Sequence, residues 1–225
     1  MFKIIQQNKL YFALYFVLFI SVFIWQFRHD WLDAFFIFSK NRSPFGDAFF
    51  RNWTLLGERY PFIIFAIFFL IIGEKAWTWQ IAMGGFLVLG VSFGLKELFS
   101  VPRPAAVLDA LGYTNDLKFV EGVELMRGAT SFPSGHTMAA FCVWSLLALR
   151  FTGQQIAQIA CLLTAFLVGV SRVYLIQHFP EDALFGSAIG LTIATIVHHY
   201  LKEKEIIGVN KTKVIAVHTV KPDVE

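Results

Sequence analysis

Charged residues and cysteines are scarce in this sequence. Only 16% of its 225 residues are charged, whereas soluble domains carry about 25%, which argues against a soluble protein. The formal net charge is only +3 and no basic run is interleaved with aromatic residues, which argues against nucleic acid as a partner. The two cysteines, Cys142 and Cys161, lie inside apolar stretches without any CxxC or Cys/His ligand spacing. This placement argues against a zinc centre or a disulfide and favours a packing role.

Apolar residues dominate instead. They make up 56% of the chain, with 26 phenylalanines and a mean hydropathy of +0.60, which is typical of an integral membrane protein. A helix that crosses the ~30 Å hydrocarbon core of a bilayer needs about 20 mostly apolar residues. Six stretches come near this length, and we expect each to form a spanning helix: 11–27, 61–73, 81–95, 137–149, 156–170 and 183–201.

The predicted fold is therefore all-α, an integral membrane bundle of six transmembrane helices. We place it in one domain, residues 1–205, followed by a C-terminal tail, residues 206–225. No small-residue cleavage site follows the first apolar stretch, so we expect that stretch to be retained as a helix. Residues 31–53 carry too many charges to span, and they predict one or two amphipathic segments in the membrane interface. Residues 100–132 are polar and predict a short lid loop.

Three short clusters of ionisable residues lie at the edges of apolar stretches. The first has Lys96 and, after six intervening residues, Arg103-Pro104; the second is Pro133-Ser134-Gly135-His136; the third is Ser171-Arg172 with His178 and Asp182 behind it. Ionisable groups so close to hydrocarbon are costly, so they indicate a functional site.

The order of the predicted helices places all three clusters on one side of the membrane. The third helix leaves the membrane just before Arg103, the fourth enters from the same side after His136, and the fifth returns there with Arg172. Six crossings then leave both termini on the other side. Lysine and arginine are nearly balanced between the two sides, with a slight lean towards cytoplasmic termini.

The cations of these clusters suit the binding of a phosphate group. Lys96 offers a point charge, and Arg103 and Arg172 each offer a planar fork for two oxygens. Ser134 can cap the helix that follows it, and Gly135 lets the backbone come close to a ligand. The free N–H groups at that helix start form an anion site.

The two histidines can divide the chemistry of phosphate-ester cleavage. His178 and Asp182 are four residues apart, and a carboxylate that holds one ring nitrogen makes the other a better nucleophile or base. His136 follows the anion site directly. One histidine can therefore attack phosphorus while the other protonates the leaving oxygen.

These three motifs resemble the signature of the type-2 phosphatidic acid phosphatase family, the lipid phosphate phosphatases related to vanadium haloperoxidases. The family pattern is Lys-x6-Arg-Pro, then Pro-Ser-Gly-His, then Ser-Arg-x5-His-x3-Asp, and the chain matches it at 96–104, 133–136 and 171–182. The compact loop between the first two motifs is similar to that of small bacterial members.

The resemblance implies a role for each motif residue. His178 would be the nucleophile that forms a phosphohistidine, Asp182 would orient it, and His136 would be the general acid. The phosphoryl oxygens would be held by Lys96, Arg103, Arg172, Ser134 and the amide of Gly135. The resemblance implies no metal and no other cofactor, and a site outside the cytoplasm, here at a bacterial inner membrane with cytoplasmic termini.

The sequence thus predicts a metal-independent membrane phosphatase whose partners are the bilayer and a lipid phosphate or diphosphate. Phosphatidic acid, phosphatidylglycerol phosphate, undecaprenyl diphosphate and the lipid A phosphates all fit. Two alternatives stay open at this point. One is a lipid phosphotransferase that passes the phosphoryl group to another lipid, and the other is a transporter or scaffold that binds anionic lipid without chemistry. The sequence predicts no oligomeric state.

Overall fold

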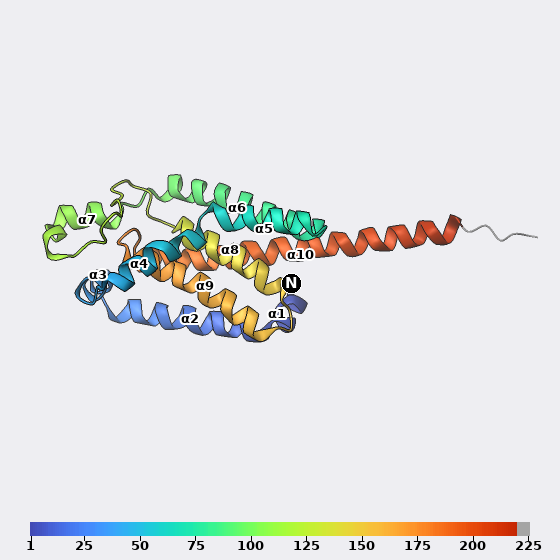
Figure 1. Ribbon diagram of the computed structural model, residues 1–225, viewed down its shortest axis with the longest axis horizontal. Coiled ribbons are helices and arrows are strands. Elements are labelled where there is room, and N and C mark those ends of the chain that lie inside the picture. Colours follow the sequence, from blue (N-terminus) through green and yellow to red (C-terminus); the bar gives the residue numbers. More distant parts are fainter. Residues whose placement is uncertain (220–225) are drawn as a thin grey trace, which may run out of the picture.

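The computed structural model of the protein describes the backbone of residues 1–219 and the side chains of residues 1–202 (Figure 1). Every regular element in this part is helical, which confirms the all-α prediction. The elements are α1 (Phe2–Gln7), α2 (Lys9–Arg28), α3 (Trp31–Lys40), α4 (Pro44–Trp53), η1 (Thr54–Gly57), α5 (Arg59–Ile71), α6 (Lys75–Phe99), α7 (Pro104–Leu111), η2 (Thr114–Asp116), α8 (Gly135–Arg150), α9 (Gln155–Tyr174) and α10 (Pro180–Thr219).

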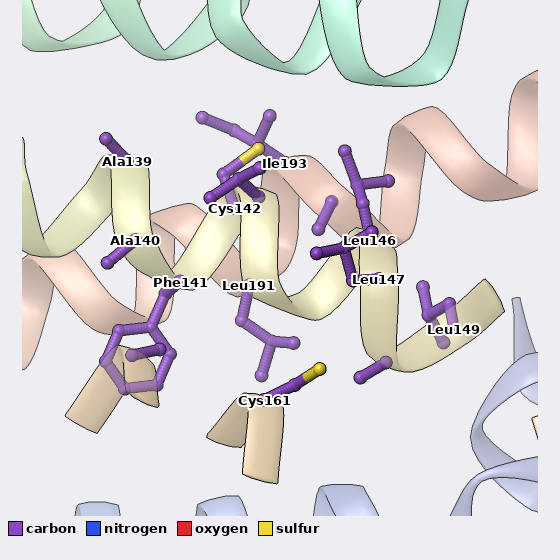
Figure 2. Packing of buried hydrophobic residues seen from close by; sticks show 14 of the residues in the cluster. Ala139, Ala140, Phe141, Cys142, Leu146, Leu147, Leu149, Cys161, Leu191 and Ile193 are labelled. Atoms are coloured by element: carbon purple, nitrogen blue, oxygen red, sulfur yellow. The ribbon is translucent and has the colours of Figure 1, made fainter. Parts of the chain in front are cut away.

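Helix α8 is the centre of the bundle. It contacts α5, α6, α9 and α10, and nearly all of its side chains after the first turn are buried. Figure 2 shows Cys142 and Leu146 on α8 and Cys161 on α9 within this core. Both cysteines are free and buried, which agrees with a packing role.

The outer helices carry an apolar surface. Phe16 on α2, Ile64 on α5 and Phe86 on α6 are all more than half exposed, and many large apolar side chains of these helices are exposed with them. An apolar surface of this extent marks a face that contacts lipid rather than water. Together with the spanning helices described next, it identifies an integral membrane protein.

Four helices are long and apolar enough to cross a membrane: α2, α6 with α7, α9, and α10 as far as Lys202. The α4–η1 segment and α5, which are bent by 54° at their junction, make a fifth candidate. The six predicted crossings are therefore matched by four or five candidates. Two of the predicted spanning helices are short: α5 has 13 residues and α8 has 16. Because each residue adds only about 1.5 Å to a helix, neither is long enough by itself to cross the ~30 Å hydrocarbon core.

The charged stretch 31–53 forms two short helices, α3 and α4, which agrees with the prediction of one or two segments there. Asp30 and Asp33 form a reciprocal capping box at the start of α3. Ser43 accepts a hydrogen bond from Gly46 N at the start of α4, where Pro44 occupies the first turn.

The expected loop at 100–132 needs correction. The stretch 100–132 is not all loop, because Pro104 starts α7 and Gly112, with a φ of 79°, ends it. Helix α10 continues without a break past the boundary that we placed after residue 205. The last part of the predicted tail, residues 220–225, lies outside the described residues.

The bundle has two distinct ends. Helices α3 and α7 lie at one end in Figure 1, together with the last turn of α6, and the N-terminus lies at the other. There the N-terminal amine of Met1 lies 3.3 Å from a ring nitrogen of His199 on α10. The end with α3 and α7 is the one that carries the three sequence clusters.

Two glycines let α10 pack directly on the backbone of α8. A Cβ on Gly186 would lie 2.8 Å from the Ser134 carbonyl oxygen, and a Cβ on Gly190 would overlap the Met138 carbonyl oxygen. The backbones of α8 and α10 cannot shift easily at these contacts, because both are held by the hydrogen bonds of a helix. This contact fixes the start of α10, and Asp182 with it, against the start of α8.

We expect Gly190→Ala to destabilise the bundle by about 1–3 kcal/mol, the usual cost of overpacking a core. The measurement is the thermal unfolding midpoint of the detergent-solubilised protein. Gly90→Ala is the matched control, because Gly90 lies within α6 and has no atom within 4 Å of the added Cβ. Equal midpoints for the two variants would contradict this account of the α8–α10 contact.

Candidate active site

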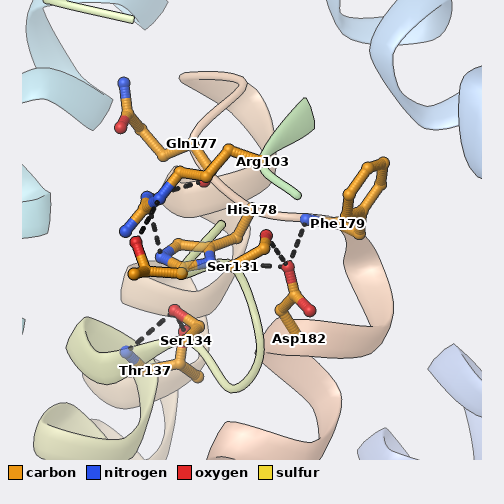
Figure 3. A network of polar contacts seen from close by, with 9 residues as sticks. Arg103, Ser131, Ser134, Thr137, Gln177, His178, Phe179 and Asp182 are labelled. Atoms are coloured by element: carbon orange, nitrogen blue, oxygen red, sulfur yellow. Dashed lines mark hydrogen bonds and ion pairs between the residues drawn. The ribbon is translucent and has the colours of Figure 1, made fainter. Parts of the chain in front are cut away.

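The three sequence clusters meet at one end of the bundle, where α6 and α9 end and α8 and α10 begin (Figure 3). The structure brings all eight predicted site residues to this end. They are Lys96, Arg103, Ser134, Gly135, His136, Arg172, His178 and Asp182.

Ser134 joins the second and third motifs. Its backbone N–H donates to the carbonyl oxygen of Asp182 at 3.0 Å. Its side chain caps α8, because Oγ accepts from Thr137 N at 3.4 Å and lies 2.9 Å from Thr137 Oγ1. The capping role that the sequence predicted for Ser134 is confirmed.

Lys96 lies beside the start of α8. A Cβ on Gly135 would be 3.6 Å from Lys96 Nζ and 3.2 Å from Ser92 Oγ, so a larger side chain at position 135 would press on the lysine. The ammonium group therefore shares one small space with the first backbone N–H groups of α8. Two independent anion-binding features coincide there.

Arg103 is buried, with 4% of its surface exposed. Its Nη1 donates to the Gln177 carbonyl oxygen at 3.0 Å and lies 3.4 Å from His178 Nε2, while its Nε donates to Thr130 Oγ1 at 3.4 Å. These neutral partners orient the guanidinium without forming a direct ion pair, and Asp182 acts on its charge only at longer range. The charge is therefore available to an anion.

Arg172 is also buried and is also held by a neutral oxygen. It is 6% exposed, and its Nη1 donates to Thr54 Oγ1 at 2.7 Å. Its buried Nε has no hydrogen-bond partner among the described residues. A buried guanidinium donor without a partner is costly, and an oxygen of a bound phosphoryl group would satisfy it.

His178 and Asp182 form the pair that their spacing predicted. Nδ1 of the buried His178 lies 3.4 Å from Oδ2 of Asp182. The same oxygen accepts hydrogen bonds from Ser131 Oγ at 2.5 Å and from Phe179 N at 2.9 Å. Asp182 is thus fixed by two donors, and Nε2 of His178 is left facing Arg103, as Figure 3 shows.

Burial, together with the positive charges of Arg172, Arg103 and Lys96, lowers the pKa of His178 well below its ordinary value. The imidazole is therefore neutral at physiological pH, and Nε2, which lies 3.4 Å from Arg103 Nη1, can carry its lone pair on the side of the cations. A neutral imidazole beside three cations is in the state that a nucleophile for an anionic ester requires.

His136 lies in a more open position than His178. Its side chain is 32% exposed, and Nε2 is 3.6 Å from Oε1 of Glu58. His136 interacts electrostatically with His178 and with the three cations of the site. The two imidazoles therefore share one pocket, with His178 enclosed and His136 partly open.

Sequence reasoning missed five residues that touch the site: Thr54, Glu58, Thr130, Ser131 and Gln177. Ser131 and Gln177 are neighbours of motif residues, and this adjacency was a signal that could have found them. Thr54 and Glu58 come from a segment far from any motif. Only the packing of η1 against α8 and α9 brings them in.

A comparison with family models decides which family this site belongs to. The model of the PAP2 superfamily matches residues 77–206, which contain all three motifs. The chain belongs to the PAP2 superfamily. This confirms the resemblance to type-2 phosphatidic acid phosphatases that the motifs predicted.

Relatives within the PAP2 superfamily are phosphatases by name. The chain is 28% identical to lipid phosphate phosphatase 2 of Arabidopsis thaliana over 70% of its own length and 63% of that protein. It is 26% identical to phosphatidylglycerophosphatase B of Haemophilus influenzae over 64% of its own length and 76% of that protein. The crystal structure of Aquifex aeolicus LpxE is similar with a TM-score of 0.63 and 28% identity, over 75% of this chain and 94% of that one.

We expect His178 to stay neutral well below the ordinary histidine pKa of about 6.5. The measurement is an NMR titration of the ¹³C-labelled imidazoles in detergent, with the His178 signal assigned by its absence in His178→Asn. Since the pKa is depressed in the fold, the stability that depends on neutral His178 is present above about pH 6.5 and is lost as the pH falls further. A His178 signal that titrates near 6.5 would contradict the desolvated site.

Proposed function

We propose that this protein is a metal-independent membrane phosphatase that hydrolyses a lipid phosphate or diphosphate. The observation that carries the proposal is the placement of His178, whose Nε2 lies 3.4 Å from Arg103 Nη1 while Nδ1 faces Asp182. A nucleophilic nitrogen directed at a buried cation suits attack on an anionic phosphorus centre. The names of the PAP2 relatives support the same reaction class.

In the first step, His178 Nε2 attacks phosphorus. The N–P bond forms and the P–O bond to the lipid breaks, so the electron pair moves to the leaving oxygen. His136 gives that oxygen its proton and becomes neutral. Asp182 stabilises the positive charge that develops on His178.

In the second step, water hydrolyses the phosphohistidine. The neutral His136 takes a proton from the water, whose oxygen bonds to phosphorus as the P–N bond breaks. Inorganic phosphate leaves, and both histidines return to their starting states. No electron donor or acceptor is needed in either step.

The cations stabilise the charge on the equatorial oxygens in both transition states. Lys96, Arg103, Arg172, Ser134 and the Gly135 amide would hold these oxygens. Such preorganised groups in a poorly solvated site usually supply the largest part of catalysis. Because Arg103 and Arg172 are each anchored by neutral oxygens, they need little reorganisation as charge develops.

An apolar cavity of about 100 Å³ supports a lipid substrate. It lies between α2, α8, α9 and α10, and its lining includes Thr137 and Pro180 near the site and Phe19 and Phe141 deeper in the bundle. We assign it to the first part of the substrate's hydrocarbon chain. Phosphatidic acid, phosphatidylglycerol phosphate, undecaprenyl diphosphate and lipid A phosphates all carry such chains.

We also propose six crossings, with α5 and α8 as the two short spans. Helix α8 is surrounded by protein, so it need not match the thickness of the lipid. An even number of crossings puts the start of the first crossing and the end of the last on the same side of the membrane. We propose that this side is the cytoplasm, following the slight lean of lysine and arginine, and that the site faces the exterior of a bacterial inner membrane.

The proposed orientation predicts that cysteines introduced at the two ends of the bundle will differ in their labelling from outside the cell. A membrane-impermeant maleimide applied to intact spheroplasts should label Asn115→Cys, at the site end, and should spare Gln154→Cys, in the turn between α8 and α9. Both positions are exposed, and both native cysteines are buried and should stay unlabelled. The reverse pattern would place the site in the cytoplasm.

The phosphohistidine gives a direct test of the activity. We expect His178→Ala to abolish hydrolysis of a ³²P-labelled lipid phosphate and to lose the acid-labile label that the wild-type protein carries after a rapid quench. His29→Ala is the matched control, because His29 is exposed and stacks on Trp25 outside the site.

Full turnover by folded His178→Ala would contradict the mechanism. Label that ends on an added lipid rather than in inorganic phosphate would identify a phosphotransferase. Binding without turnover or label would identify a transporter or scaffold.

A further inference from the structure

The bend between α4 and α5 brings polar groups to the site from outside the three motifs. Thr54 accepts a hydrogen bond from Arg172 Nη1 at 2.7 Å. Four residues later, Oε1 of Glu58 lies 3.6 Å from His136 Nε2. One short segment thus contacts both a phosphate-binding cation and the proposed general acid.

Close packing at Gly57 fixes the position of this segment. A Cβ on Gly57 would lie 2.5 Å from Val168 Cγ1 and 2.6 Å from the His136 carbonyl oxygen. The α4–η1 segment and α5 meet here at a bend of 54°. Only a glycine permits this approach, and it places the next residue, Glu58, beside the imidazole of His136.

The charges around His136 give Glu58 a specific task. Arg172, Lys96 and Arg103 face His136 from α9, α6 and the start of α7, and His178 faces it from the loop before α10. These cations oppose protonation of His136. A general acid must nevertheless carry its proton before the ester bond breaks. A carboxylate 3.6 Å from the imidazole acts against this repulsion, as does the anionic phosphoryl group of a bound substrate.

We propose that Glu58 is a positioning residue that keeps His136 protonated and oriented for proton transfer to the leaving oxygen. Contact of the carboxylate with Nε2 leaves Nδ1 as the nitrogen that gives its proton away. His136 is then neutral, with its remaining proton on Nε2 towards Glu58. The inference rests on the proposed phosphatase activity and adds a residue to the motif set of that site.

The test compares two leaving groups in the full-length protein in detergent. The alkoxide of dioctanoyl phosphatidic acid needs a proton to leave, whereas the nitrophenolate of p-nitrophenyl phosphate leaves without one. We expect Glu58→Gln to lower kcat/KM for phosphatidic acid by about 10²-fold, the lower range for loss of general acid catalysis. Its kcat/KM for p-nitrophenyl phosphate, which reports the steps up to P–O cleavage and not the later hydrolysis of the phosphohistidine, should stay unchanged. Glu58→Asp should recover part of the loss.

The pH dependence of phosphatidic acid hydrolysis provides a second readout. The alkaline limb, where the His136 proton is lost, should move to lower pH in Glu58→Gln. An NMR titration of the His136 imidazole should move in the same direction without any substrate. Glu74→Gln is the matched control, because Glu74 is a partly exposed glutamate that pairs with Arg150 at the other end of the bundle.

Each outcome decides the proposal. An equal loss of activity on both substrates would make Glu58 a merely structural residue, and no loss on either would remove it from the mechanism. Both results would leave the phosphatase itself intact. Wild-type protein that hydrolyses neither substrate, or forms no phosphohistidine, would overturn the proposed function and the Glu58 proposal together.

Discussion

The close contact between α8 and α10 is the constraint on which the site depends. Gly186 and Gly190 let the two backbones touch, and the Ser134 amide then donates to the Asp182 carbonyl oxygen. This single hydrogen bond ties the Pro-Ser-Gly-His turn to the residue that faces His178. The proposed nucleophile, His178, and the helix start proposed to bind phosphate are therefore held by the same packing that holds the bundle.

The second organising feature is an excess of buried positive charge. Arg103 and Arg172 are anchored by neutral oxygens, and Lys96 lies over the first turn of α8. Asp182 is directed at His178 and Ser131 rather than at these cations. Such a cluster is costly without an anion, and a phosphorylated ligand would supply that anion at this end of the bundle.

The helix pattern was largely predictable from hydropathy. All six apolar stretches became helices, because an apolar run flanked by charges has few other structures available in a membrane. Their lengths were less predictable. Helix α8 is short where neighbouring helices rather than lipid cover its side chains, and α5 is short because η1 and a 54° bend precede it. The α7 helix was missed because the stretch 100–132 is polar as a whole, and this hid the apolar segment Pro104–Leu111 with its Pro104 and Gly112 signals.

The sequence by itself determined which groups make up the candidate site, since the motif spacing picks out the cations, the histidines and Asp182 within short local segments. The tertiary structure alone decided which groups surround them. Thr54 and Glu58 belong to none of the three motifs. Thr54 reaches Arg172 and Glu58 reaches His136. Both contacts depend on Gly57, which allows η1 to lie against α8 and α9. Local spacing can specify neighbours along one helix, but contacts between distant segments depend on backbone approach that no single segment encodes.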